Sequence, residues 1–579
     1  MRRKIDAEKI KDKYAYELGR LSDILESINA DTAIAYSIVS RHRKKSVEEV
    51  NAHPHLLTLY GADFKDVESI QGLHGLQYDE IRISALIRSV YDAEIMTGST
   101  VVELGKLVLG CWRLEEKAGV YKDTPVVVLG NTLEKEYETF RSSDDGHIYV
   151  ISPYIRVMEE RVDRDVRTTL KKGPRCSVTS EIVKEVEQEL GIEYDETQKE
   201  AFSLLGEGIS ILTGGPGTGK TAVLKGIIRA HEKLRDAPVV LCCPTGKGAR
   251  VMREATGREA QTIHKTLCIY PGGSGYDLGE ELPRGALVIV DEFSMIDLAL
   301  MEVLMIAVAH SGTQIIFVGD EDQLPSVRYG NIAHDLIACG KIKVCRLETI
   351  HRQNPNCAIV KNAAKIRIGD LGLYTDTGKE FRTFREKQFF DEMEMARVAM
   401  GIFIKNFSGD VDAVKIITPV KDPKYGCSTQ RLNCSLHCYY HQGEEEINGI
   451  SVGDPIIITR NIHGLGLLNG DGGICVSLEN GLTVRIDGKD YTLTGEDIQS
   501  VDLAYAITCH KSQGSSIDKA IVLVPQEPRC MLTRRMLYVA VTRAREVCLV
   551  LHQGDAWDTA IRNEQEVTRK TGLLERLEK

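Results

Sequence analysis

The sequence predicts an α/β protein with two parallel sheets, a small β-rich insert and a mainly helical N-terminal part. Three observations lead to this prediction. A glycine-rich G-x-x-x-x-G-K-[ST] pattern stands between a run that suits a buried strand and a run that suits a helix. Short β-branched runs alternate with helical patterns around this loop and again near the C-terminus. The 579 residues exceed what one hydrophobic core supports, so we expect three or four domains.

Composition narrows the class of protein. Hydrophobic residues make up 42% and charged residues 27%, which is ordinary for a globular protein. A net charge of −11 argues against a surface coated with nucleic-acid-binding charge, although a local basic groove is compatible with it. The 15 cysteines form no C-x-x-C pair, which suits reduced thiols. The charged N-terminus resembles no signal peptide and no apolar run could span a bilayer. We therefore expect a cytoplasmic protein without membrane contact.

The N-terminal part, residues 1–172, is predicted to be a helical domain. Apolar residues recur there at helical spacing, most clearly over residues 81–95. Gly173 and Pro174 predict a linker. Residues 181–190 are expected to form a short helix that leads into the next domain.

A first parallel sheet is predicted within a domain spanning residues 173–350. Its candidate strands alternate with helical patterns, which favours a sheet covered by helices. A short hairpin insert is expected near residues 266–285, with its tip at Pro271 to Gly275. The candidate strands are residues 209–212, 239–242, 286–290 and 314–318.

A second α/β domain is predicted from residues 351–450 and 500–579. Residues 451–499 between its two parts are rich in Gly, Asp and Asn and contain an alternating apolar stretch at 484–486. We expect a small inserted β-barrel there. The candidate strands of the second sheet are residues 415–418, 503–508, 520–524 and 547–551.

The glycine-rich loop at residues 214–221 predicts the binding of a nucleoside triphosphate. Glycines let backbone N–H groups wrap the phosphates, and the following helix points its positive end at them. Lys220 is placed to reach the β- and γ-phosphates, and Thr221 to offer its hydroxyl to Mg²⁺. A chance Gly-rich turn is the alternative, and the strand–loop–helix context argues against it.

Other polar residues follow predicted strands. Asp291 and Glu292 end an apolar strand, where Asp291 could hold Mg²⁺ and Glu292 could polarise an attacking water. Gln323 follows the next strand and could sense the γ-phosphate, or be an ordinary loop amide. Arg352 and Arg543 are candidates for charge-neutralising fingers, although most arginines lie on solvated faces.

One cysteine–histidine group has two interpretations. Cys434, His437, Cys438 and His441 stand at helical i, i+3, i+4 and i+7 spacing and could share one face. They could bind a metal, although the spacing fits no common zinc pattern, or belong to a partly buried helix.

This set of motifs resembles the superfamily 1 helicases, and within them the RecD-like family. The resemblance covers nearly the whole chain. It implies two RecA-like P-loop NTPase domains, an inserted Src-homology-3-like β-barrel and an N-terminal domain typical of the longer members. The segments that carry it are Gln198 in 194–202 and residues 214–221, 243–250, 262–265, 291–297, 319–326, 347–353, 469–473, 510–514, 538–543 and 567–577.

The resemblance implies ATP and Mg²⁺ as cofactors. The expected catalytic residues are Lys220, Glu292, Gln323, Arg352 and Arg543, and the expected metal ligands are Thr221 and Asp291. The expected nucleotide-binding residues are Gln198, Gly214, Gly215, Pro216, Gly217, Thr218, Gly219, Lys220, Thr221 and Gly514.

The implied substrate is single-stranded DNA and its junctions with duplex. The resemblance implies movement 5′ to 3′ and a hairpin after residue 265 that acts as a pin splitting the duplex. Tyr270 or Tyr276 could stack on the first broken pair, or only pack within the hairpin. Repair, recombination or replication is the implied setting, with single-strand-binding or repair-complex partners left open. The expected strand contacts are Pro244, Thr245, Lys247, Thr262, His264, Thr508 and His510.

Two positions depart from the family pattern. Phe293 stands where a small residue is usual, and Ser515-Ser516 replaces a glutamate that can hold the ribose. The alternatives are a translocating ATPase on RNA, one that strips proteins from DNA, or a subunit that mainly binds within a larger complex. The presence of Lys220, Glu292 and both arginines argues against a pure binding subunit.

Overall fold

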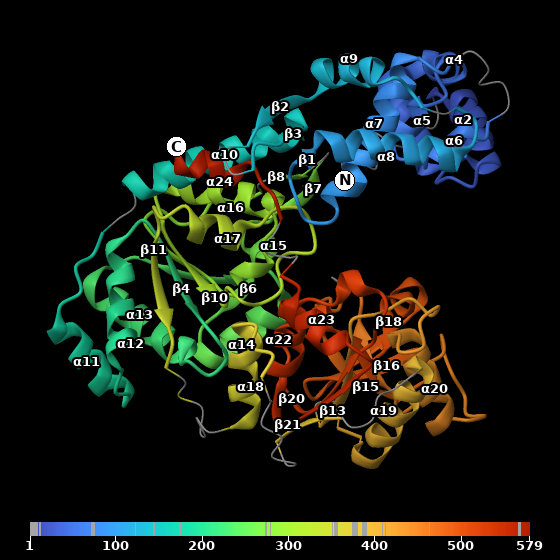
Figure 1. Ribbon diagram of the computed structural model, residues 1–579. Helices are drawn as coiled ribbons and strands as arrows, with labels where there is room; N and C mark the ends of the chain where they lie inside the picture. Colours follow the sequence, from blue (N-terminus) through green and yellow to red (C-terminus); the bar gives the residue numbers. More distant parts are fainter. Residues whose placement is uncertain are drawn as a thin grey trace. The chain divides into compact units, whose positions relative to one another are not determined.

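The chain forms two compact units in this computed structural model (Figure 1). Unit 1 comprises Met1–Glu160, Val327–Asn331 and Arg569–Arg576, and unit 2 comprises the rest. The structure describes residues 10, 13–70, 76–121, 123–142, 145–172, 175–272, 275–277, 279–349, 351, 357–372, 380–384, 391–407, 409–410, 413–462, 464–564 and 569–579. The predicted linker Gly173-Pro174 lies outside them.

Unit 1 is built from helices and one small antiparallel sheet. The sheet has the order β1 (Val102–Glu103), β3 (Ile148–Ile151), β2 (Glu138–Arg141). The helix predicted over residues 81–95 is confirmed as α7 (Glu80–Ile95), which begins where the Asp79 side chain accepts the Arg82 N–H. The other helices are α2 (Ala15–Ser27), α3 (Ala33–His42), η1 (Arg43–Lys45), α4 (Ser46–Ala52), α5 (Leu56–Leu59), α6 (Phe64–Glu68), α8 (Leu104–Ala118), α9 (Val126–Glu136) and α10 (Pro153–Lys172), which continues into unit 2.

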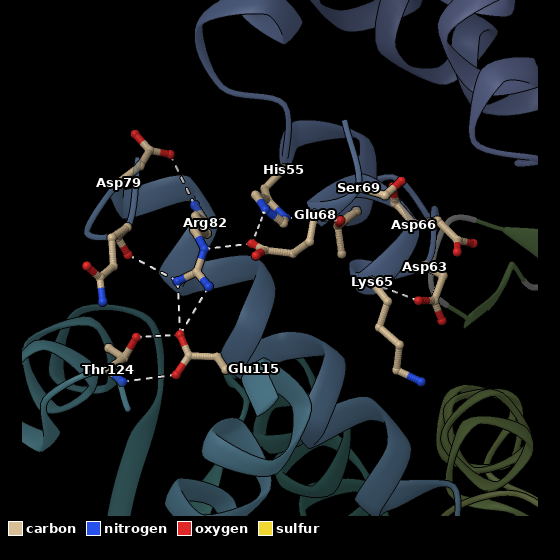
Figure 2. A network of polar contacts seen from close by, with 12 residues as sticks. His55, Asp63, Lys65, Asp66, Glu68, Ser69, Asp79, Arg82, Glu115 and Thr124 are labelled. Carbon is tan, nitrogen blue, oxygen red and sulfur yellow. Dashed lines mark hydrogen bonds and ion pairs between the residues drawn. The ribbon is translucent and has the colours of Figure 1, made fainter. Parts of the chain in front are cut away.

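A buried polar network ties five segments of unit 1 together (Figure 2). The Arg82 guanidinium donates to Glu68 Oε1 at 2.7 Å and to Glu115 Oε1 at 3.0 Å. His55 Nε2 lies 2.8 Å from the same Glu68 oxygen, and Glu115 accepts the backbone N–H of Thr124 at 2.9 Å. Because Arg82 and both carboxylates are almost fully buried, these bonds replace the water that the charges lose on folding.

The C-terminal segment departs from the prediction. We expected residues 500–579 to belong to the second α/β domain, but Arg569–Arg576 belongs to unit 1. Lys570 O accepts the Thr100 N–H at 2.9 Å, and the Gly572 N–H donates to Glu159 Oε1 at 3.1 Å. Backbone bonds to buried partners from unit 1 thus fix this segment, and no local pattern in the sequence reveals them. It contains most of α24 (Leu573–Glu578).

The first sheet of unit 2 is entirely parallel. Its strand order is β11 (Lys343–Leu347), β4 (Ile209–Gly214), β10 (Gln314–Gly319), β9 (Leu287–Val290), β5 (Val239–Cys243), β6 (Ala260–Thr262). The four predicted strands are confirmed, and β6 and β11 are additional. The accompanying helices are α11 (Ser180–Leu190), α12 (Glu196–Glu200), η2 (Ala201–Gly206), α13 (Lys220–Leu234), α14 (Gly246–Thr256), α15 (Ile263–Thr266), η3 (Phe293–Met295), α16 (Leu298–Ser311) and α17 (Ile332–Ala338).

A short hairpin branches from this sheet, as predicted. Strand β7 (Tyr270–Gly272) pairs antiparallel with β8 (Gly275–Asp277). It lies within the expected segment 266–285.

The second parallel sheet has the order β12 (Phe381–Thr383), β21 (Ala544–His552), β20 (Ile517–Val524), β13 (Val414–Thr418), β19 (Ala506–Thr508). The strand predicted over residues 503–508 is wrong in its extent: only Ala506–Thr508 joins this sheet, while Leu503 ends a strand of the inserted sheet. The apolar run is continuous, but the chain passes from one sheet to the other at Ala504 and Tyr505. The helices are α18 (Ala358–Arg367), α19 (Glu392–Asn406), α20 (Thr429–Tyr440), α21 (Cys509–Ser512), η5 (Arg529–Met531), α22 (Arg534–Thr542) and α23 (Ala556–Arg562).

The inserted sheet is antiparallel, with the order β17 (Lys489–Leu493), β16 (Leu482–Ile486), β15 (Gly472–Ser477), β14 (Pro455–Ile458), β18 (Val501–Leu503). It extends past the expected end at residue 499, because β18 follows the 3₁₀ helix η4 (Gly495–Ser500) and pairs with β14. Its buried side chains form a core of their own, which includes Ile456, Val484 and Leu493.

Candidate active site

The glycine-rich loop lies between β4 and the N-terminus of α13. Gly217 and Gly219 adopt φ values of +84° and +83°, a conformation that side chains rarely tolerate. The Lys220 ammonium turns back over the loop and donates to the carbonyl of Gly215 at 3.0 Å and to that of Gly214. The first N–H groups of the 15-residue helix point towards the same place, so the loop is built to receive an anion.

Gln198 lies against this loop. It belongs to a capping box with Asp195 at the start of α12, and its Nε2 donates to Thr218 O at 3.3 Å. A Cβ at Gly219 would approach that nitrogen to 2.5 Å, so a side chain at this position would displace the Gln198 amide. The backbone N–H of His351 donates to Gly217 O at 2.8 Å, and its ring contacts Asp195. The neighbouring Arg352 lies outside the described residues.

Two carboxylates stand at the end of β9, beside the loop. Glu292 has φ +55°, which is rare for a residue with a side chain and typical of strained functional positions. Its Oε2 is buried and has no hydrogen-bond partner in the described part of the chain. Burial and the adjacent Asp291 raise the pKa of Glu292 to about 7, while Arg543 and Lys220 act in the opposite direction. The pKa of Asp291 is also raised by burial.

The packing of Phe293 accounts for the large residue at this position of the family pattern. Its ring is fully buried and packs against Phe317 with ring centroids 6.0 Å apart. A Cβ at Gly319 would come within 2.7 Å of the Phe293 ring. The large side chain therefore fills space that glycine leaves at the end of β10.

The loop after β10 is contacted from the second sheet. Gln323 is buried, its Oε1 lacks a partner in the described structure, and its carbonyl accepts Arg535 Nη1 at 3.3 Å. The Tyr538 hydroxyl donates to Asp320 Oδ2 at 2.9 Å. Gln513 Nε2 donates to Leu324 O at 3.3 Å. Sequence reasoning missed Tyr538 and Asp320 as a pair, because their separation of 218 residues gives no local signal.

Arg543 follows α22 and is buried. Its Nε donates to Val539 O at 3.1 Å. Because its charge lowers the pKa of Glu292, it acts on one carboxylate that Lys220 also influences. A cavity of about 170 Å³ lies between the loop and α18 and α22, and its lining includes Gly215, Pro216, Tyr538 and Thr542.

Three of the residues predicted to contact single-stranded DNA occupy equivalent positions in the fold. Thr245, Thr262 and Thr508 each follow a parallel strand and each accepts a backbone N–H as the N-cap of the next helix. Lys247 Nζ donates to Ser515 Oγ at 2.6 Å, which links α14 with the segment after α21. Burial lowers the pKa of His264, which favours its neutral form. Of the remaining strand candidates, Pro244 directly precedes Thr245 and His510 lies in α21; Gly514, expected at the nucleotide, follows α21.

The donor set at the loop fits Mg²⁺. Thr221 offers a hydroxyl at the start of α13, and Asp291 offers a carboxylate. Asp291 forms no ion pair with any described residue, and burial raises its pKa. No group of three or more His, Cys, Asp or Glu side chains able to hold a metal occurs among the described residues, so the Cys434–His441 hypothesis gains no support. His437 and His441 instead pair with Asp454 at 2.8 and 3.3 Å.

The chain has two parallel sheets, a phosphate loop after β4 of the first, and Arg543 from the second α/β domain, whose charge acts on Glu292. These features define a P-loop NTPase with two RecA-like domains. The family described as AAA domain matches residues 193–388, and the UvrD-like helicase C-terminal domain matches residues 503–551. Among the helices of the described residues, none has the length and apolar character needed to cross a membrane.

Relatives at about 30% identity identify the family. The ATP-dependent RecD2 DNA helicase of Deinococcus radiodurans is 30% identical over 467 residues, covering 78% of this chain and 62% of the relative. The RecBCD enzyme subunit RecD of Mycolicibacterium smegmatis is 31% identical over 461 residues, covering 72% and 80%. Bacteroides Pif1 bound to ssDNA matches in structure with 20% identity and a TM-score of 0.40, covering 62% of this chain and 92% of its own. The chain belongs to the RecD-like family of helicases, and it spans less than two thirds of the first of these relatives.

Proposed function

We propose that this chain is an ATP-dependent helicase that moves along single-stranded DNA and unwinds duplex, in repair or recombination. The observation that carries the proposal is the Glu292 carboxylate. Its Oε2 is buried, it forms no ion pair with any described residue, and the charges of Lys220 and Arg543, one from each α/β domain, both lower its pKa. A group with a pKa of about 7 is suited to accept a proton from an attacking water at neutral pH.

In this proposal, each residue acts on ATP through contacts it is placed to make. The loop N–H groups and Lys220 bind the phosphates, and Gln198 reads the base. Thr221 and Asp291 would hold Mg²⁺, which neutralises phosphate charge. Glu292 orients and deprotonates water, Gln323 would donate its side-chain N–H to the γ-phosphate, and Arg543 stabilises the developing charge. Arg352 is proposed as a second finger from the family resemblance alone.

Hydrolysis is coupled to movement through the loop after β10. Tyr538, Arg535 and Gln513 from the second sheet all contact this loop, so a change at the γ-phosphate reaches both sheets. The two α/β domains would close on ATP and open after hydrolysis. This movement would shift the DNA-contacting residues that follow β5 and β6 relative to those that follow β19, and so advance the single-stranded DNA. We propose 5′ to 3′ movement, from the family resemblance.

The other parts of the chain receive roles by the same resemblance. We propose that the inserted sheet corresponds to the Src-homology-3-like barrel, that residues 1–172 form an N-terminal helical domain, and that the β7–β8 hairpin is the duplex-splitting pin. The predicted domain boundaries belong to this proposal, apart from the C-terminal segment and β18.

The second candidate function is a translocating subunit of a larger complex. It is favoured by one observation: a relative of which the chain covers 80% is named a RecBCD enzyme subunit. Such a subunit would hydrolyse ATP on DNA and unwind poorly alone.

Unwinding of two partial duplexes tests the proposal, one with a 5′ and one with a 3′ single-stranded tail. We expect ATP-dependent unwinding of the 5′-tailed substrate only, and its loss in Lys220→Ala. ATPase activity without unwinding of either substrate would favour the subunit function. Unwinding of the 3′-tailed substrate would reverse the proposed polarity.

A further inference from the structure

The loop after β10 continues directly into a segment that belongs to unit 1. Residues 319–326, which include Gln323, lie in unit 2, and the next five residues, Val327–Asn331, lie in unit 1. The chain returns to unit 2 at α17, which begins at Ile332. Because five residues can extend over roughly 17 Å, this segment fixes the end of the loop only if it is itself held in place.

Two hydrogen bonds hold this segment at Gly330. The Gly330 N–H donates to Gly98 O at 2.9 Å, and the Gly330 carbonyl accepts Arg569 Nη1 at 3.3 Å. Gly98 lies just after α7, and Arg569 is the first residue of the C-terminal segment of unit 1. Both backbone groups of Gly330 are therefore bonded to parts of the chain that are distant in sequence.

The Arg569 side chain fits closely against Gly98. A Cβ at Gly98 would collide with the Arg569 guanidinium, so the missing side chain leaves room for it. Gly98 also has a φ of +110°, which residues with a side chain rarely adopt. The residue that accepts the Gly330 N–H thus also determines where the guanidinium lies.

The segment that carries Arg569 is anchored by other bonds as well. The Lys570 N–H donates to Ser99 Oγ at 3.2 Å, and the Lys570 carbonyl accepts the Thr100 N–H at 2.9 Å. Lys570 Nζ lies 3.2 Å from Asp145 Oδ2. Because these bonds do not involve the Arg569 side chain, its loss should leave the C-terminal segment in place.

The loop itself is bonded to the second α/β domain. Arg535 and Gln513 donate to the carbonyls of Gln323 and Leu324, both at 3.3 Å. A movement of these donors displaces Gln323 relative to the phosphate loop only if the rest of the loop does not follow. The anchor at Gly330 supplies the fixed point that such a displacement needs.

We infer that Arg569 is a positioning residue for ATP hydrolysis. Through Gly330 it fixes the end of the loop that presents Gln323 to the γ-phosphate. The inference rests on the proposed role of Gln323, and it gives the C-terminal segment of the chain a part in the reaction.

Steady-state ATPase measurements on Arg569→Met test the inference, because this variant loses the guanidinium and keeps an unbranched side chain. We expect kcat to fall about tenfold and KM for ATP to change little, since the phosphate loop still binds the nucleotide. Arg569→Lys keeps a donor for the Gly330 carbonyl and should recover most of kcat. All variants are compared at a temperature at which thermal unfolding shows them to be folded.

Lys570→Ala is the matched control, because it changes the adjacent residue of the same segment. It removes only a partly exposed ion pair with Asp145, so kcat should stay that of the unmodified chain. An equal decrease of kcat in Lys570→Ala and Arg569→Met would assign the effect to the segment as a whole and overturn the inference.

A double-mutant cycle shows whether Arg569 acts through Gln323. In a Gln323→Ala background, Arg569→Met should cause no further decrease of kcat, because the residue that it positions is gone. If Gln323→Ala lowers kcat, then an unchanged kcat in Arg569→Met, or additive effects in the cycle, would overturn the inference and leave the proposed function standing. An unchanged kcat in Gln323→Ala would overturn both the proposed role of Gln323 and the inference.

Discussion

Unit 1 and the active site each contain several charged side chains shielded from solvent, but these charges are paired in unit 1 and left without an ion pair among the described residues at the active site. In unit 1, the Arg82 guanidinium bonds directly to Glu68 and Glu115 (Figure 2), and the pKa of Glu68 is lowered despite its burial, through bonds from His55 and Arg82. At the active site, Asp291 and Glu292 form no ion pair with any described residue, and burial raises the pKa of both.

The difference separates a structural cluster from a reactive one. Charges that are paired within the chain hold helices together, although one oxygen of the cluster, Glu68 Oε2, has no hydrogen-bond partner among the described residues. Charges left without a pair are costly to fold and are retained where a ligand or a reaction uses them. Burial alone would have placed both clusters in one class.

The largest effect is expected from Arg82→Met. Removing one partner of a buried ion cluster leaves two buried carboxylates, so unfolding of unit 1 should become easier by about 3–5 kcal/mol. Denaturation followed by the fluorescence of Trp112, which lies in unit 1, measures this change. Arg88→Met, on the same helix but in an exposed pair with Asp92, should cost less than about 1 kcal/mol. Equal costs would show that the cluster is not structural.

Glu292→Gln should lower the catalytic activity and leave the stability unchanged, the opposite of Arg82→Met. We expect kcat for ATP to fall by roughly 10²–10⁴, since general-base catalysis is lost, while the stability of the chain is kept. Steady-state ATPase measurements and thermal unfolding report the two quantities. Glu254→Gln, an exposed carboxylate on α14, serves as the control. An unchanged kcat in Glu292→Gln would show that Glu292 is not the general base.

The two clusters should also respond oppositely to pH. The pKa of Glu292 is raised to about 7, so kcat/KM should fall about tenfold per pH unit below 7, and its ionisation should destabilise the fold as pH rises from about 4.5 through 7. The pKa of Glu68 is lowered, so its stabilisation is present above about 4.5 and lost as pH falls through its folded value. A pH profile of kcat/KM with no inflection near 7 would contradict this assignment.

The smallest effect is expected from Tyr538→Phe. It removes the hydroxyl that bonds Asp320 across the two sheets, a loss of about 1.5–3 kcal/mol for a bond to a charged group. We expect this loss to appear mainly in kcat, as about a tenfold decrease with KM for ATP little changed, because the loop after β10 is held less firmly. Tyr439→Phe, an exposed tyrosine on α20, is the comparison. A change confined to KM would argue against coupling between the sheets.

Local patterns predicted much of the fold, because strands of a parallel sheet are short apolar runs bounded by loops. The phosphate loop and Asp291 follow from such patterns. The Thr245, Thr262 and Thr508 caps could also have been found, since each follows a strand and precedes a helix. The break between Leu503 and Ala506 could not, because no Gly or Pro interrupts the run.

The rest depends on contacts between distant segments. The φ value of Glu292, the bond from Tyr538 to Asp320 and the place of Arg569–Arg576 in unit 1 are set by partners that the sequence does not pair. The fit between Phe293 and Gly319 also required coordinates, although a large residue at this position was visible as an anomaly.

The join between β18 and β19 has a mechanical consequence. Only Ala504 and Tyr505 separate the two strands, both are buried, and the Tyr505 hydroxyl bonds Asp454 at the other root of the inserted sheet. The residues at both ends of the inserted sheet are therefore held close to the second sheet. We therefore expect a displacement of the insert to move Thr508 with little loss, because only two residues connect β18 to β19.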